Sequence, residues 1–118
     1  MRVGIDLIEI ARISRARQRW GERFLNRVFS ASEVVASHGR AASLAGRFAA
    51  KEAAAKALGV GIGPVDWRDI EVSVGAAGEP LLLLHGRARE LSQRLGVSQA
   101  VVSISDTAEH AVAVVVLN

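Results

Sequence analysis

Apolar and polar positions repeat along the chain with two different periods, and these periods predict its elements. A two-residue period predicts five strands, over residues 3–7, 70–74, 81–85, 100–105 and 111–117. A helical period predicts helices over residues 10–20, 40–58 and 88–95, with a shorter helix opened by a capping box at Ser30–Glu33. Because strands and helices do not alternate regularly, we expect an α+β fold, in which a mostly antiparallel sheet packs against the long central helix and the shorter helices.

Length and composition are those of one folded unit, and we expect residues 1–118 to form a single domain. Half of the residues are hydrophobic and the mean hydropathy is +0.25, which argues against disorder and indicates that another subunit covers apolar surface. Cysteine is absent, which excludes a disulfide scaffold, a thiolate metal site and a cysteine nucleophile. No apolar run is long enough to span a bilayer, and the acids within residues 1–10 do not fit a signal peptide, so we expect a cytoplasmic protein without membrane contact.

The charge of the chain predicts an acidic partner. Fifteen lysines and arginines stand against twelve aspartates and glutamates, which gives a net charge of +3 and a pI near 10.5. The partner is then a nucleic acid, a phosphorylated metabolite or an acidic protein. Thirteen of the basic residues are arginines, and the only two lysines, Lys51 and Lys56, lie in one short segment. This placement is either chance or a sign that lysine is needed there.

The predicted long helix has three different faces. One face carries very small side chains, which allow a sheet or another helix to approach closely: Ala42, Gly46, Ala50, Ala53 and Ala57. On the opposite side, Arg40, Arg47 and Lys51 form a basic stripe. Glu52 and Lys56 lie on a flank that is otherwise apolar. They form either an ordinary i,i+4 ion pair on a solvated surface, or a carboxylate and an ammonium at the rim of a cleft, suited to binding Mg²⁺, accepting a proton and neutralising phosphate charge.

An acid and a glycine-rich loop add to this candidate site. Asp6 lies in the first predicted strand, where it is either a solvent-facing residue of the alternation or a site residue. Paired with Glu52, it would form a two-carboxylate Mg²⁺ site that water and ligand phosphate complete. The loop over residues 59–64 follows the C-terminal end of the long helix, so it is not a Walker-type phosphate loop. Its glycines instead let a bulky ligand approach the backbone.

The first predicted helix presents arginines without interleaving acids. Arg12, Arg15, Arg19 and Arg23 lie within about 80° of one another if the helix continues to residue 23. Such a face is either ordinary solvated surface or a docking surface for an acidic helix or a nucleic-acid backbone. Nucleic acid fits less well, because aromatic residues make up only 4% of the chain and no RNA-binding motif is present.

One block of the long helix closely resembles the signature of a known family. Residues 46–59, GRFAAKEAAAKALG, are similar to the signature of the holo-acyl-carrier-protein synthases, the small 4′-phosphopantetheinyl transferases. The opening Gly4-Ile5-Asp6 resembles the first motif of that family, and Gly78-Glu79-Pro80 and residues 102–107 follow in the expected order. The resemblance covers essentially the whole chain. It departs from the pattern at Asp106, where many members carry histidine, so no role of that histidine is transferred.

The resemblance implies a reaction, a metal and partners. The phosphopantetheine arm of coenzyme A is transferred to a serine hydroxyl of apo acyl carrier protein, and adenosine 3′,5′-bisphosphate is released. Asp6 and Glu52 are implied to hold Mg²⁺, with Lys56 as a further catalytic residue. Glu52, directly or through a metal-bound water, is the candidate base. A homotrimer with active sites at subunit interfaces is also implied, whereas the type of carrier protein, for fatty acids or polyketides, stays open.

Binding residues follow from the same resemblance. Those implied for coenzyme A are Arg47, Phe48, Lys51, Gly59, Gly61, Ile62, Gly78, Pro80 and Asp106. Those implied for the acidic, helical carrier protein are Arg12, Arg15, Arg19, Arg23 and Arg27.

Two other functions stay open at the level of the residues. One is a small basic nucleic-acid-binding module without catalysis, which a thermal shift with nucleic acid, set against one with coenzyme A and Mg²⁺, would separate from a transferase. The other is an inactive relative retained for oligomerisation, which the presence of Asp6, Glu52 and Lys56 argues against.

Overall fold

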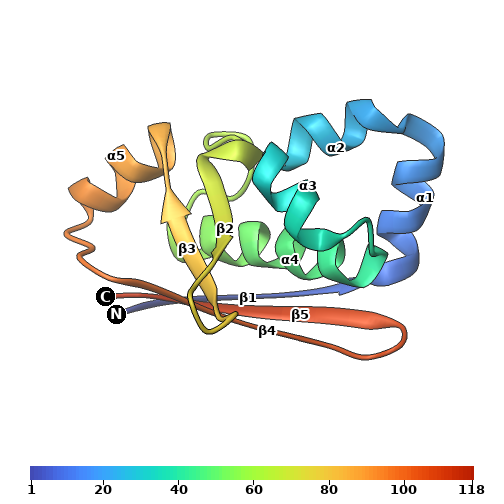
Figure 1. The fold of residues 1–118 in the computed structure, drawn as a ribbon. Coiled ribbons are helices and arrows are strands. Elements are labelled where there is room, and N and C mark those ends of the chain that lie inside the picture. Colours follow the sequence, from blue (N-terminus) through green and yellow to red (C-terminus); the bar gives the residue numbers. More distant parts are fainter.

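The computed structural model describes residues 1–118 and places a three-stranded sheet against a long central helix (Figure 1). The sheet consists of β1 (Arg2–Glu9), β5 (His110–Leu117) and β4 (Ala100–Asp106), in the order β1-β5-β4. Both pairs of neighbouring strands are antiparallel, and β1 pairs with β5 along its whole length. The first and last strands of the chain therefore lie side by side, which brings both termini to one end of the sheet (Figure 1).

The central helix α4 (Ala41–Ala57) covers one face of this sheet, because the residues that meet there are small. Gly4 of β1 lies so close to the helix that a Cβ atom at this position would be 1.8 Å from the carbonyl oxygen of Ala53. A looser contact joins Gly46 to Ile104 of β4, where a Cβ atom would be 2.8 Å from Cγ2. The face of small residues expected on the helix therefore lets its backbone approach the sheet closely.

Three short helices surround the side of α4 that faces away from the sheet (Figure 1). They are α1 (Ile10–Trp20), α2 (Glu22–Val28) and α3 (Ala31–Ser37). Gly21 separates the first two, because its φ of 57° and ψ of −133° suit glycine and interrupt the helical backbone. The capping box is present: Ser30 Oγ accepts a hydrogen bond from the Glu33 N–H at 3.2 Å, and Glu33 Oε1 accepts one from the Ser30 N–H at 3.0 Å.

A hairpin and a last helix complete the fold. The hairpin pairs β2 (Ile70–Val74) with β3 (Pro80–Leu84) and follows the 3-10 turn η1 (Trp67–Asp69), while α5 (Gly86–Arg94) precedes β4. All strand pairs are antiparallel, so the α+β prediction with a mostly antiparallel sheet is confirmed. The sequence pattern missed α2 as a separate helix. None of the helices combines the length and the hydrophobicity that a membrane span requires.

No helix covers the other face of the three-stranded sheet (Figure 1), and this face carries apolar side chains. On β1, Val3, Ile5 and Leu7 point away from α4 and are 59%, 58% and 66% exposed. The antiparallel register sets alternate valines of β5 beside them, namely Val112, Val114 and Val116. Val101 of β4 continues the row at 50% exposed. We call these seven residues the outer sheet face; they form an apolar patch of the kind that marks contact with another protein surface.

Candidate active site

Two acids and a lysine from distant parts of the chain meet where β1 lies against α4. Lys56, near the end of α4, donates hydrogen bonds from Nζ to Asp6 Oδ1 and to the carbonyl oxygen of Ile5, both at 3.0 Å. The Lys56 side chain is 52% exposed and that of Asp6 only 16%, so solvent reaches the pair from the lysine side. Glu52 lies one helical turn before Lys56, on the same side of α4. The structure thus brings Asp6, Glu52 and Lys56 together.

The electrostatics of Glu52 place it in the same cluster. Burial raises the pKa of the Glu52 carboxyl above its ordinary value of 4.5, and the negative charge of Asp6 raises it further. The positive charges of Lys56 and Arg12 act in the opposite direction. Lys56 pairs with Asp6 and not with Glu52, so the ordinary i,i+4 ion pair considered for Glu52 and Lys56 does not form. Glu52 is a half-buried carboxylate beside a second acid, an arrangement that favours a bound cation or a proton.

A second polar site lies nearer the beginning of α4. A cavity of about 270 Å³ is lined by Arg40, Ala42, Ser43, Gly46, Arg47, Ile104 and Asp106. Arg47 is 9% exposed, and its Nη1 donates a hydrogen bond to Ser43 Oγ, whereas its buried Nε has no partner. Burial lowers the pKa of Arg47; the charge of Glu33 raises it and that of Arg40 lowers it. Two arginines at one cavity, one of them with an unused donor, suit an anion such as phosphate.

The glycine-rich loop lies at the far end of α4 from Arg47. Gly59 ends the helix with a φ of 84°, and Gly61 follows with a φ of 71°, both in the left-handed region that favours glycine. Ile62, half-buried, comes next in the loop. Gly59 lies twelve positions after Arg47, which corresponds to about 18 Å along a helix axis.

Gly78 and Pro80 belong to neither of these sites. Gly78, with a φ of 85°, lies in the turn between β2 and β3, and Pro80 begins β3. Neither residue lines the cavity of Arg47. Within one protomer, the residues predicted to bind coenzyme A therefore fall into separate groups.

Comparison with known proteins identifies the family of this chain. Residues 2–115 match the sequence profile of the 4′-phosphopantetheinyl transferase superfamily. The chain is 48% identical over 120 residues to the holo-[acyl-carrier-protein] synthase of Herpetosiphon aurantiacus, an alignment that covers 96% of this chain and 94% of that protein. The chain belongs to this superfamily. It is 48% identical over 117 residues to the synthase of Moorella thermoacetica as well, with 97% of this chain and 91% of that protein covered.

A solved structure agrees with this assignment. The Helicobacter pylori holo-[acyl-carrier-protein] synthase in complex with coenzyme A superimposes with a TM-score of 0.90 and 39% sequence identity, covering 98% of this chain and 99% of that one. The family resemblance of residues 46–59, the enzyme class and the fold are thereby confirmed. The chain is a phosphopantetheinyl transferase.

A large, mainly apolar cavity of the transferase was not predicted from the sequence. It measures about 420 Å³ and is lined by Trp20, Phe24, Val28, Phe48 and Trp67, with Arg23 and Arg27 beside them. The rings of Phe48 and Trp67 are 4.6 Å apart between centroids. Trp20 of this cavity is 51% exposed. We call this the aromatic cavity, because four of the five aromatic residues of the chain line it. Their sequence positions did not indicate that they would cluster.

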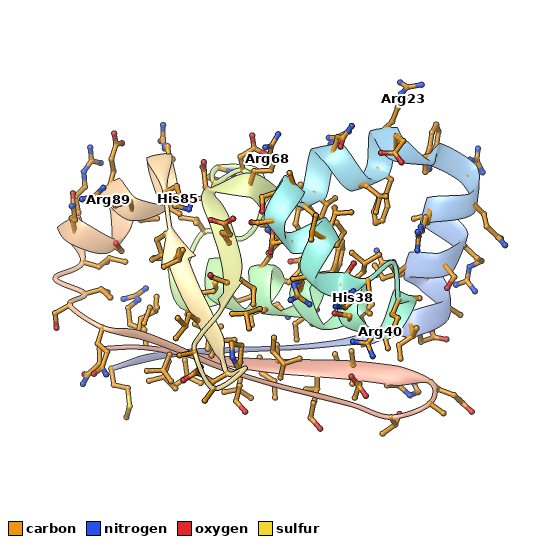
Figure 2. All side chains as sticks on the ribbon, viewed as in Figure 1. Arg23, His38, Arg40, Arg68, His85 and Arg89 are labelled. Atoms are coloured by element: carbon orange, nitrogen blue, oxygen red, sulfur yellow. The ribbon has the colours of Figure 1, made fainter.

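The arginines expected on one continuous helix face are divided between two helices of the transferase. Because α1 ends at Trp20, Arg12, Arg15 and Arg19 lie on α1, while Arg23 and Arg27 lie on α2. The first helix ends at Trp20, as predicted, so the condition for one continuous arginine face up to residue 23 is not met. Arg23 and Arg27 flank the aromatic cavity instead, and Figure 2 shows Arg23 projecting outward from α2.

Lys51 lies in the interior of the transferase, which corrects its assignment to coenzyme A. Its side chain is 0% exposed, and Nζ donates hydrogen bonds to Glu33 Oε1 at 2.8 Å, to the carbonyl of Trp67 at 3.1 Å and to the carbonyl of Ile70. An ammonium group has three N–H donors, so none is left for a phosphate. Burial lowers the pKa of Lys51, and Glu33 raises it. The basic stripe expected on α4 does not include Lys51, because η1 and β2 cover this side of the helix.

Proposed function

We propose that the transferase moves the 4′-phosphopantetheine arm of coenzyme A onto a serine hydroxyl of an acidic apo acyl carrier protein. The serine oxygen attacks the phosphorus that bears the pantetheine arm. The bond from this phosphorus to the bridging oxygen breaks, and adenosine 3′,5′-bisphosphate leaves with the bonding electron pair. The observation that carries the proposal is the convergence of Asp6, Glu52 and Lys56 at a solvent-accessible place. The Helicobacter pylori relative is a holo-[acyl-carrier-protein] synthase in complex with coenzyme A, which supports the same two substrates for this chain.

Asp6 and Glu52 would hold Mg²⁺. The residues fit this ion, because both offer the hard oxygen ligands it prefers and lie close enough for Asp6 to raise the pKa of Glu52. The structure contains no group of three or more histidine or acidic side chains that could hold a metal ion. Water and substrate oxygens would therefore complete the six ligands of Mg²⁺. When bound, the ion neutralises charge on the diphosphate. Lys56 adds a second positive charge at the same place.

Glu52 would accept the proton of the attacking serine. In the protein without a bound ion, its raised pKa makes the Glu52 carboxylate a stronger base than an exposed one. Lys56 and Arg12 stabilise its ionised form, which is the form that takes up a proton.

Arg47 would contact a phosphate of coenzyme A from the cavity that it shares with Arg40 and Asp106. The unpartnered Nε of Arg47 supports this role, since an anion in the cavity would satisfy a buried donor. The remaining predicted contacts with coenzyme A are Phe48, Gly59, Gly61, Ile62, Gly78 and Pro80.

A homotrimer would combine these separate groups into complete sites. In one protomer, Arg47 and the end of α4 that carries Lys56 and Gly59 lie well apart, which supports active sites shared between neighbouring subunits. The outer sheet face supports association, because its exposed valines, isoleucine and leucine are stabilised when another apolar surface covers them.

The carrier protein would dock on the arginines of α1 and α2. Arg12 connects this surface to the acids, since its charge lowers the pKa of Glu52. An acidic helix bound to Arg12, Arg15 and Arg19 would therefore lie next to the proposed base. The aromatic cavity between Arg23 and Arg27 offers an apolar pocket on the same partner surface.

Mass spectrometry of an apo carrier protein incubated with coenzyme A, Mg²⁺ and the transferase tests the proposed reaction. We expect the carrier to gain the mass of one phosphopantetheine group on its serine, and to stay unmodified when a chelator removes the metal ion. A carrier that stays unmodified in the complete mixture would contradict the proposal.

Reversing two charges on α1 is expected to weaken carrier docking selectively. In Arg12→Glu with Arg19→Glu, the KM for the carrier should rise at least about ten-fold, because like charges then face each other, while the KM for coenzyme A changes little. Carrier binding to the unmodified protein should also weaken steeply with added salt. Steady-state kinetics with each substrate varied in turn measures both KM values.

The matched control carries the same charge change on α5. Arg89→Glu with Arg94→Glu alters exposed arginines of α5, which lies at the other end of the molecule from α1, so it should leave the KM for the carrier unchanged (Figure 1). An equal rise in both KM values after the change on α1 would show that the arginine surface is wrongly assigned.

A further inference from the structure

We propose that the buried ion pair of Glu33 and Lys51 positions the walls of the aromatic cavity and thereby sets the affinity for the carrier protein. Both residues are positioning residues, since neither reaches the surface. The effect on the carrier rests on the function proposed above, whereas the effect on the cavity does not.

The ion pair joins four elements in the interior. Both side chains are 0% exposed, and their charged atoms are 2.8 Å apart. Glu33 Oε1 also accepts a hydrogen bond from the Ser30 N–H at 3.0 Å, and Glu33 Oε2 accepts one from the Val72 N–H at 3.0 Å. The other two N–H groups of Lys51 donate hydrogen bonds to the carbonyl oxygens of Trp67, the first residue of η1, and of Ile70, which follows η1. The pair therefore holds α3, α4, η1 and β2 in one fixed arrangement.

Lys51 contacts residues that support both walls of the aromatic cavity. On one side, Lys51 Nζ holds the carbonyl of Trp67, and the Trp67 ring packs on Phe48. On the other side, Nζ lies 5.8 Å from the centroid of the Phe29 ring. Phe29 in turn meets the cavity residue Phe24 edge to face, with centroids 6.1 Å apart and ring planes at 84°. Moving this ammonium would displace Trp67 and Phe24 together.

Stability alone does not account for a buried pair of this kind. Removing two charges from water is unfavourable, and well-packed apolar residues in their place are often as stable or more stable. An apolar pair could not, however, hold the carbonyl of Trp67 or the N–H of Val72 in place. What the ion pair provides is therefore a defined geometry behind the cavity.

The decisive variant is Glu33→Gln with Lys51→Met, made in a Trp20→Phe background so that Trp67 is the only tryptophan. Removing both charges leaves no unpaired buried charge, so we expect this variant to fold. Relative to the Trp20→Phe parent, Trp67 fluorescence should shift to longer wavelength and be quenched more readily by acrylamide. The KM for the carrier should rise about ten-fold, with kcat nearly unchanged. If the double variant does not fold, Glu33→Asp, which shortens the pair but keeps both charges, is measured with the same readouts.

The matched control is Glu71→Gln, which loosens the same junction of α3 and β2 from outside. Glu71 accepts hydrogen bonds at 2.8 Å from Ser30 Oγ and Ser32 Oγ and pairs with His85 Nε2 at 2.9 Å, and these contacts lower the pKa of Glu71 to about 2. None of these partners lines the aromatic cavity. The control should leave Trp67 fluorescence and both KM values unchanged.

Each failure is distinguishable. Unchanged Trp67 fluorescence in the double variant overturns the positioning role, and the fluorescence needs no carrier, so this result stands even if the transferase proves not to use a carrier protein. Altered fluorescence with an unchanged KM overturns the link to carrier affinity. An equal rise in KM for the double variant and for Glu71→Gln would show only general loosening, and would overturn the proposal as well.

Discussion

Glu52→Gln is expected to reduce phosphopantetheine transfer by about 10³-fold or more. Glutamine keeps the shape of the side chain but cannot accept a proton, and its neutral amide is a poor ligand for a divalent cation. Loss of a general base alone removes on the order of 10²–10⁴-fold of rate. Transfer is measured under saturating coenzyme A and carrier, with Glu109→Gln, an exposed acid in the turn between β4 and β5, as the control.

The same substitution is expected to leave the fold at least as stable at neutral pH in the absence of Mg²⁺. The pKa of Glu52 is raised in the folded state, mainly by burial and then by Asp6, so its ionised form is less favourable there than in the unfolded chain. Glutamine removes this cost. The stability difference between variant and wild type should disappear as the pH falls below the ordinary carboxyl value of 4.5, where the unfolded chain is also protonated. Chemical denaturation of both proteins at several pH values measures this difference in the free energy of unfolding.

Two results would reject this role. Wild-type turnover in Glu52→Gln would show that Glu52 is neither the base nor a metal ligand. A variant that unfolds would show that the carboxylate supports the fold rather than the reaction.

Gly4→Ala is expected to destabilise the protein by about 3–4 kcal/mol, a large share of the stability of a chain this size. The added Cβ atom would lie 1.8 Å from the carbonyl oxygen of Ala53 and 3.0 Å from the Ala57 nitrogen, so β1 and α4 would have to separate. Because these two elements carry Asp6 and Glu52, transfer should fall with stability. Urea denaturation followed by circular dichroism gives the free energy of unfolding.

Gly46→Ala on α4 is the matched control. Its Cβ atom would lie 2.8 Å from the Cγ2 methyl group of Ile104 and close to no backbone atom of another element, and alanine favours helix over glycine by about 1 kcal/mol, which offsets this contact. We expect a change close to zero. Equal losses in the two variants would mean that the contact of β1 with α4 is looser than the structure describes.

Most of the architecture follows from local sequence patterns. The bounds predicted for the elements over residues 10–20, 70–74 and 100–105, and for the long helix, agree with the observed bounds to within one residue. The capping box at Ser30 is present because its hydrogen bonds involve residues only three positions apart. The exception is α2, where a single glycine with positive φ interrupts what would otherwise be a longer helix.

The same patterns did not predict which side chains of a strand face the core and which face solvent. On β1, apolar Val3, Ile5 and Leu7 point to solvent in the protomer, while Asp6 points to α4, the reverse of an amphipathic strand with a buried apolar face. The tight contact at Gly4 decides this, because only the side of β1 with small residues admits the helix.

The sequence by itself determined the elements other than α2, the small-residue face of α4 and the motif around Glu52, since all three depend on residues close together in the chain. Only the tertiary structure decided that Lys51 is buried while Lys56 meets Asp6, and that four aromatic residues enclose one cavity. The physical reason is that the exposure and charge environment of a side chain depend on which distant segment packs over it, and a helical wheel contains no information about that segment.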